Sequence, residues 1–75
     1  MNERDRQTWE ELKADARGLG EDLAGESLEA AKEIMKPFMA IWHREMKSYG
    51  WDADSKLIEL VEVMGKGYAE AKGLK

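Results

Sequence analysis

The sequence contains no cysteine, which excludes disulfides, thiolate zinc sites, iron–sulfur ligation and cysteine nucleophiles. It contains a single histidine, His43, which is too few for a histidine-rich metal site. We therefore expect no metal and no cofactor. A chain of 75 residues buries only about 60% of the surface that its unfolded form exposes, so its own core is marginal. Without disulfides or a bound metal, stability must come from helix packing, helped by self-association.

Other features are scarce as well. β-branched residues are few, and no segment alternates apolar and polar residues in the manner of a strand. The longest mostly apolar stretch, 37–42, is far too short to span a bilayer. The first eleven residues are charged and lack the apolar region of a signal peptide. These absences predict a cytoplasmic protein with no membrane partner.

The charge balance is acidic, with 12 basic and 16 acidic residues and a net charge of −4. Phosphate backbones repel such a chain, which makes direct nucleic-acid binding unlikely on charge alone. A hydrophobic content of 43% beside 37% charged residues indicates a folded, highly charged helical protein rather than a disordered one.

The first expected helix follows a frayed segment, 1–7. Thr8 and Glu11 fit a capping box, which predicts that the helix begins at Thr8. Gly18 and Gly20 then interrupt its apolar stripe, and each costs about 1 kcal/mol relative to alanine in a helix. Either one helix runs from about Thr8 to Ala24, or it breaks at these glycines and restarts. We favour the second alternative, a short first helix with a break or a weakened turn.

The second expected helix is long. Ser27 is a suitable N-cap, and Gly50 is well placed as the left-handed residue that ends the helix. Because the apolar pattern continues through Pro37, we expect a kink there rather than a stop. At 100° per residue, the apolar residues occupy about half of the circumference, more than one neighbour can cover. They are Leu28, Ala31, Ile34, Met35, Phe38, Met39, Ile41, Trp42, Met46 and Tyr49.

The third expected helix starts after Asp52 or Asp54, and the turn before it is short enough to make it an antiparallel neighbour of the second. The fold class is a single all-α, three-helix domain over 1–75, with the short first helix packed across the other two. Because three helices cannot cover so wide an apolar face, the sequence predicts a homodimer or a higher homo-oligomer. The expected interface comprises Phe38, Ile41, Trp42 and Glu45. Glu45 lies inside the apolar face, so it is either exposed or paired with a cation.

Catalysis finds no support in the sequence, because no nucleophile–base pair, phosphate-binding loop or metal-binding pair is present. We expect His43 to be an exposed residue on the polar face of the second helix. A helix-turn-helix interpretation would make the third helix the reading helix, but Glu59 and Glu62 on its exposed face oppose contact with DNA.

Acidic residues are concentrated in the first half of the chain, where residues 1–35 contain ten acids and five bases. The spacing of four of them would align them on one face of a continuous helix, and the second helix is acidic at its start and basic at its end. One interpretation is an isologous dimer in which antiparallel helices pair acid with base. The other is a surface that binds a partner protein. The residues of that expected surface are Asp22, Glu26, Glu29, Glu33, Tyr49 and Trp51.

In general character, a short, acidic, cysteine-free helical chain is similar to many phage and mobile-element accessory proteins. That resemblance implies a protein that binds and blocks a host factor, as anti-restriction and anti-CRISPR proteins do. The predicted function is therefore a non-enzymatic inhibitor or adaptor that occupies a protein surface. The alternatives are an oligomer that sequesters a nucleotide, and a helix-turn-helix-like DNA-binding regulator.

Overall fold

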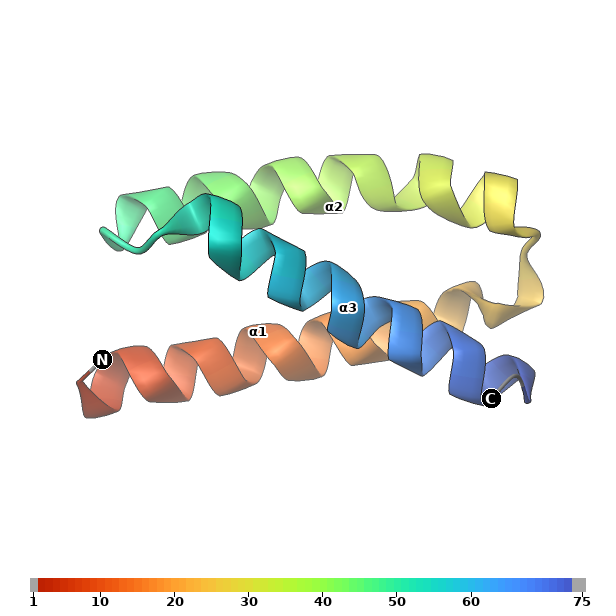
Figure 1. Cartoon of the computed structure of the whole chain (residues 1–75), viewed down its shortest axis with the longest axis horizontal. Coiled ribbons are helices and arrows are strands. Elements are labelled where there is room, and N and C mark those ends of the chain that lie inside the picture. Colours follow the sequence, from red (N-terminus) through yellow and green to blue (C-terminus); the bar gives the residue numbers. More distant parts are fainter. Residues whose placement is uncertain (1, 74–75) are drawn as a thin grey trace.

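The three helices of the chain are of nearly equal length (Figure 1). A computed structural model describes residues 2–73. Helix α1 spans Glu3–Asp22, a short 3-10 turn η1 spans Leu23–Gly25, α2 spans Leu28–Ser48 and α3 spans Ala53–Lys72. No strand occurs within this described part of the chain. The prediction of an all-α, three-helix fold is confirmed.

Helix α1 begins earlier than the sequence suggested. Asn2 caps it, because its side-chain oxygen accepts a hydrogen bond of 2.8 Å from the backbone N–H of Asp5. Glu3 and Asp5 place negative charge in the first turn, where the helix dipole favours it. Thr8 lies inside the helix, and its hydroxyl donates to the carbonyl oxygen of Arg4. The expected start at Thr8 is therefore wrong, and Glu3–Gln7 are helical rather than frayed; residue 1 lies outside the described residues.

The expected break at the two glycines of α1 is also wrong, since the helix continues to Asp22. Gly20 is buried at a point where α3 crosses α1. A Cβ atom at Gly20 would lie 2.0 Å from the carbonyl oxygen of Met64. On α3, a Cβ atom at Gly67 would lie 2.4 Å from the carbonyl oxygen of Arg17. These two glycines permit the backbones of α1 and α3 to touch.

Both ends of α2 agree with the sequence prediction. The Ser27 hydroxyl accepts a hydrogen bond from the backbone N–H of Ala30. At the other end Gly50 has a φ of 81°, its N–H donates to Lys47, and the N–H of Trp51 donates to Met46. This pair of bonds is the Schellman arrangement, which satisfies the last free carbonyls of a helix. The helix runs through Pro37 without interruption, as predicted.

Helix α3 lies between the other two helices (Figure 1). Asp52 caps it, accepting hydrogen bonds from the backbone N–H and the hydroxyl of Ser55. The helix is antiparallel to α2, as expected, but it packs mainly on α1 and runs in the same direction as α1. Helices α1 and α2 make little direct contact. The element that crosses the others is thus α3, and not the first helix as we expected.

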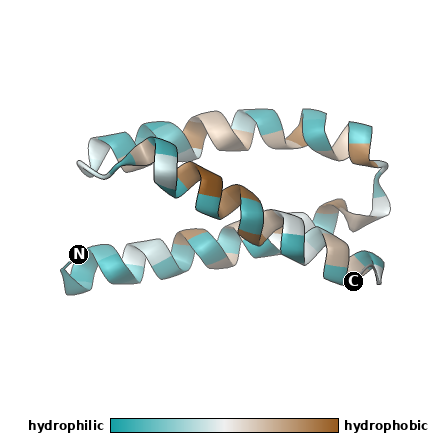
Figure 2. Cartoon of the chain, viewed as in Figure 1, coloured by the Kyte–Doolittle hydropathy of each residue, from teal (hydrophilic) through white to brown (hydrophobic). Residues whose placement is uncertain are grey.

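The core lies where α3 meets the other two helices. Figure 2 shows the most hydrophobic stretch of the chain on α3, in the middle of the fold. Two side chains, Met46 and Leu60, are completely enclosed. Within residues 2–73, no helix has the length and hydropathy needed to cross a bilayer. The buried core cluster consists of Trp9, Leu12, Ala16, Trp42, Met46, Ala53, Leu60 and Met64.

Candidate functional site

The wide apolar face of α2 is only partly covered by the rest of the chain. Ala31, Trp42 and Met46 are buried, but Leu28 at the start of the helix and three large apolar residues in its middle are exposed. Ile34 is 39% exposed, Phe38 40% and Ile41 53%. They lie at positions i, i+4 and i+7 and therefore share one flank of the helix. We call these three residues the α2 strip.

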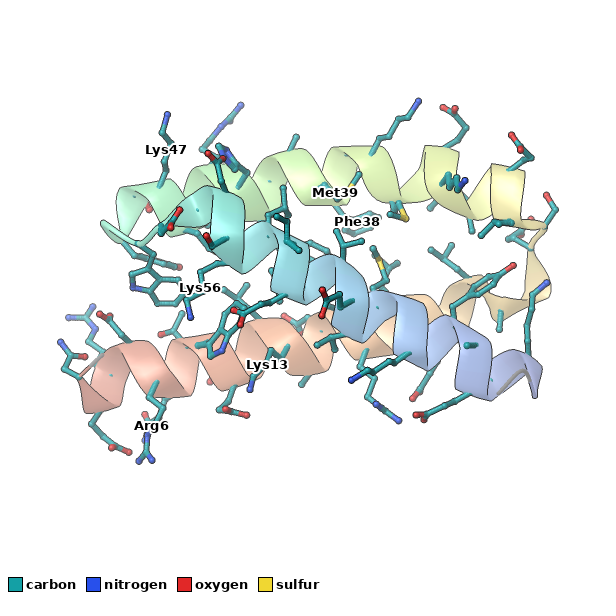
Figure 3. The ribbon with its side chains drawn as sticks, viewed as in Figure 1. Arg6, Lys13, Phe38, Met39, Lys47 and Lys56 are labelled. Carbon is teal, nitrogen blue, oxygen red and sulfur yellow. The ribbon has the colours of Figure 1, made fainter. Side chains whose placement is uncertain are left out.

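The α2 strip is exposed because α3 packs on the neighbouring face of α2, which carries the buried Trp42 and Met46. The ring nitrogen Nε2 of His43 lies 2.8 Å from the carboxylate of Asp54, which ties the far side of that face to α3. The strip is about 140–180° away from His43 around the helix axis, and α1 makes little contact with α2. Figure 3 shows Phe38 on α2, and the centroid of its ring is 6.2 Å from that of the buried Trp42. The strip is therefore a continuation of the core that the described chain leaves uncovered.

Two of the four residues predicted for an oligomer interface belong to this strip. Phe38 and Ile41 are members, and Glu45 lies one turn beyond Ile41 on the same flank. Glu45 is exposed, which is one of the two alternatives that its position allowed. Trp42 differs from its predicted place in the interface, because it is only 7% exposed and belongs to the core cluster. Ile34 is the strip residue that the predicted interface omitted. Its helical spacing to Phe38 and Ile41 would have been enough to identify it.

The four acidic residues of the predicted partner surface do not share one helical face. Asp22 ends α1, Glu26 follows η1, and Glu29 and Glu33 lie in the first turns of α2. All four are exposed, and Glu33 forms an ion pair of 3.0 Å with Lys36. The chain changes direction between Asp22 and Glu29, so the continuous helix that would have aligned them does not exist.

The aromatic part of the predicted partner surface lies far from this acidic part. Tyr49 is twenty residues from Glu29, which corresponds to about 30 Å along a helix. Trp51 is half-buried, and its ring makes an edge-to-face contact with Trp9 at 6.1 Å and a tilted contact with Tyr49 at 5.1 Å. Trp51 packs against the core and only Tyr49 is freely exposed.

Two lysines complete the aromatic cluster at this end of the fold. The ammonium of Lys56 lies 4.6 Å from the centroid of the Trp9 ring, and that of Lys13 lies 5.7 Å from it. Lys56 lies between α1 and the start of α3, and Lys13 lies on α1 (Figure 3). Cation–π contacts of this kind contribute about 0.5–1 kcal/mol at exposed sites. Trp9 is itself 8% exposed, so its ring joins α1 to α3 and is not free for a ligand to stack on.

His43 differs from its expected role as an exposed surface residue. It is half-buried, and its contact with Asp54 joins α2 to the first turn of α3. The pairing was not visible in the sequence because the two residues are eleven positions apart, on separate helices.

The described residues contain no cluster of three or more histidine, aspartate or glutamate side chains placed to hold a metal ion. Among the same residues, every buried residue is apolar or glycine.

Comparisons with protein families, with curated proteins and with solved structures found no match. The α2 strip is thus the strongest candidate for a functional surface in the described part of the chain.

Proposed function

We propose that this chain is a non-enzymatic protein-interaction module, and that the α2 strip is its docking surface. The observation that supports the proposal is the exposure of Ile34, Phe38 and Ile41 on one flank of a helix whose other flank is buried. Contiguous apolar side chains on a small protein are typical of interaction sites. Docking would remove these three side chains from water, which is favourable by about 25 cal/mol for each Å² of apolar surface.

The occupant that the charges favour is a second copy of the chain, with the two α2 helices antiparallel. When the twofold axis passes near Phe38, Ile34 of one copy lies near the partner's Ile41, and each Phe38 meets the other. Glu33 and Arg44 are both exposed and border the strip on its polar side. In this arrangement Glu33 lies near the partner's Arg44. A parallel pair would instead separate Glu33 from the partner's Arg44 by eleven residues, about 16 Å along the helix axis.

Glu45 also finds a favourable place in the antiparallel pair. Its position on the strip flank would put its carboxylate beside the first turn of the partner's α2. The positive end of a helix dipole and its free N–H groups stabilise a carboxylate there, by about 0.3–1 kcal/mol at an exposed site. The carboxylate that interrupts the apolar face is therefore compatible with the dimer.

The more specific function, an inhibitor or adaptor that blocks a host protein, remains a prediction from the sequence. Within the proposed dimer, the acidic residues around the α1–α2 connection stay accessible at both ends. They are Asp22, Glu26 and Glu29, and all three are exposed in the single chain. A basic surface on another protein would complement them and gain in association rate from the charge.

Ile41→Lys tests the proposed docking surface, because it places a charge on the strip without touching a buried residue. Sedimentation equilibrium from micromolar to millimolar concentration should show the wild type approaching twice its mass of 8.6 kDa. Ile41→Lys should remain at 8.6 kDa with its helicity retained. The matched control is Ile58→Lys, because Ile58 is 62% exposed on α3 and lies outside the strip. A monomeric wild type, or equal association of the two variants, would contradict the proposal.

A further inference from the structure

A second feature of the fold, separate from the α2 strip, is an apolar pocket of about 140 Å³. It lies between the first half of α2 and the crossing of α1 and α3. The α2 residues that line it lie about 60–180° around the helix axis from Ile34 and Ile41. Its apolar side chains come from η1, α2 and α3, and α1 contributes the backbone of Gly20. They are Leu23, Leu28, Ala31, Met35, Val61 and Met64.

The pocket exists because of the glycines that shape this end of the fold. Gly20 holds α1 directly against α3, so α2 cannot enter between them. Gly65 lines the pocket with backbone alone, and a Cβ atom there would meet no other atom within 4 Å. Leu28 lies at the pocket with 57% of its surface exposed. A side chain of ordinary size at position 65 would begin to fill the space.

One positive charge lies at the pocket. Among the described residues, Lys32 is the only charged residue that lines it, and no carboxylate does. Tyr68 also lines it, and its hydroxyl donates a hydrogen bond of 3.0 Å to the carbonyl oxygen of Glu26, which ties α3 to the α1–α2 connection. The ammonium of Lys72 lies 4.9 Å from the Tyr68 ring. A ligand with an apolar body would therefore meet an ammonium group at the point where its polar end reaches water.

We infer that this pocket binds a small amphipathic anion, a short aliphatic or aromatic carboxylate. Its volume is close to that of an apolar protein cavity of about 150 Å³ known to bind benzene. Apolar pockets with a few placed polar groups are typical of small-molecule sites. The apolar walls hold the hydrocarbon part, and Lys32 attracts the carboxylate. This site is separate from the docking surface, because none of the residues that line it belongs to the α2 strip.

The test is a titration of the ¹⁵N-labelled protein with hexanoate, hexan-1-ol and hexylamine, which share one hydrocarbon chain and differ in the charge of the head group. Hexanoate should shift the backbone amide signals of Lys32, Gly65 and Tyr68. It should bind about fivefold more tightly than hexylamine, as expected for one solvent-exposed charge contact. Lys32→Met should abolish this preference, and Lys47→Met, on the same helix but outside the pocket, should retain it.

A second variant tests the apolar part of the site. Ala31→Leu adds three carbons to a residue that lines the pocket and is 4% exposed, so it should weaken hexanoate binding at least tenfold. Circular dichroism shows whether Ala31→Leu folds. If Ala31→Leu is unfolded, the loss of charge preference in Lys32→Met still tests the inference. The inference is overturned if hexanoate shifts none of the pocket amides up to its solubility limit. It is also overturned if hexanoate and hexylamine bind equally, or if the shifts centre on Ile41 instead.

Discussion

Gly20→Ala should lower the free energy of unfolding by about 3 kcal/mol, at the upper end of the range for overpacked positions. The added Cβ would lie 2.0 Å from the carbonyl oxygen of Met64 and 2.9 Å from the backbone nitrogen of Tyr68. Both neighbours are backbone atoms, so no flexible side chain can move aside. Helices α1 and α3 must separate to admit the methyl group, and the core between them must open.

Gly18→Ala is the matched control, two residues away on the same helix. A Cβ atom at Gly18 meets no other atom within 4 Å, so alanine there should stabilise the helix by about 1 kcal/mol. The same contrast is expected on α3 between Gly67, which faces the backbone of Arg17, and the open Gly65. Urea denaturation followed by circular dichroism measures all four variants. If Gly20→Ala were as stable as Gly18→Ala, the close crossing of α1 and α3 would be wrong.

Trp42→Ala should cost about 3–5 kcal/mol, the range for removing a large aromatic side chain from a core. Trp42 is 7% exposed and packs within the core cluster. Domains have about 0.05–0.15 kcal/mol of stability per residue, so this chain has roughly 4–11 kcal/mol in total. The substitution should therefore remove at least about a quarter of the total stability.

Helicity measured by far-ultraviolet circular dichroism is the appropriate readout for Trp42→Ala, because the substitution itself removes part of the fluorescence. Ile58→Ala serves as the control, since Ile58 is 62% exposed and should tolerate truncation with a change of about 0.5 kcal/mol. A loss below 1 kcal/mol for Trp42→Ala would show that Trp42 is a surface residue, as the sequence prediction of an interface role had it.

The features of α2 were predictable because their signals are local. The Ser27 cap, the left-handed Gly50 and the continuous apolar pattern through Pro37 all lie within the helix or next to it. The same local reasoning failed for α1. Gly18 and Gly20 look identical in a helix-propensity argument, and only the approach of α3 distinguishes them. A contact between residues more than forty positions apart leaves no trace in the local pattern.

The candidate site was predictable in kind but not in detail. The width of the apolar face on α2 predicted that part of it would be uncovered. Phe38 and Trp42 differ by only 40° around the helix axis, yet one is 40% exposed and the other 7%. Which of the two is covered depends on where α1 and α3 pack, and the sequence showed neither the close α1–α3 pair nor the distance of α1 from α2.

Disulfide cross-linking tests the proposed antiparallel dimer most directly, because the chain has no cysteine and any introduced thiol is the only one. Ile34→Cys and Ile41→Cys variants are oxidised separately and as an equimolar mixture. Disulfides need Cα atoms about 4.4–6.8 Å apart, so they report which residues face each other. The antiparallel arrangement predicts that the mixed Ile34–Ile41 cross-link forms in preference to either homodimer. Preferred cross-linking of each variant with itself, or no cross-linking beyond that of an Ile58→Cys control, would contradict it.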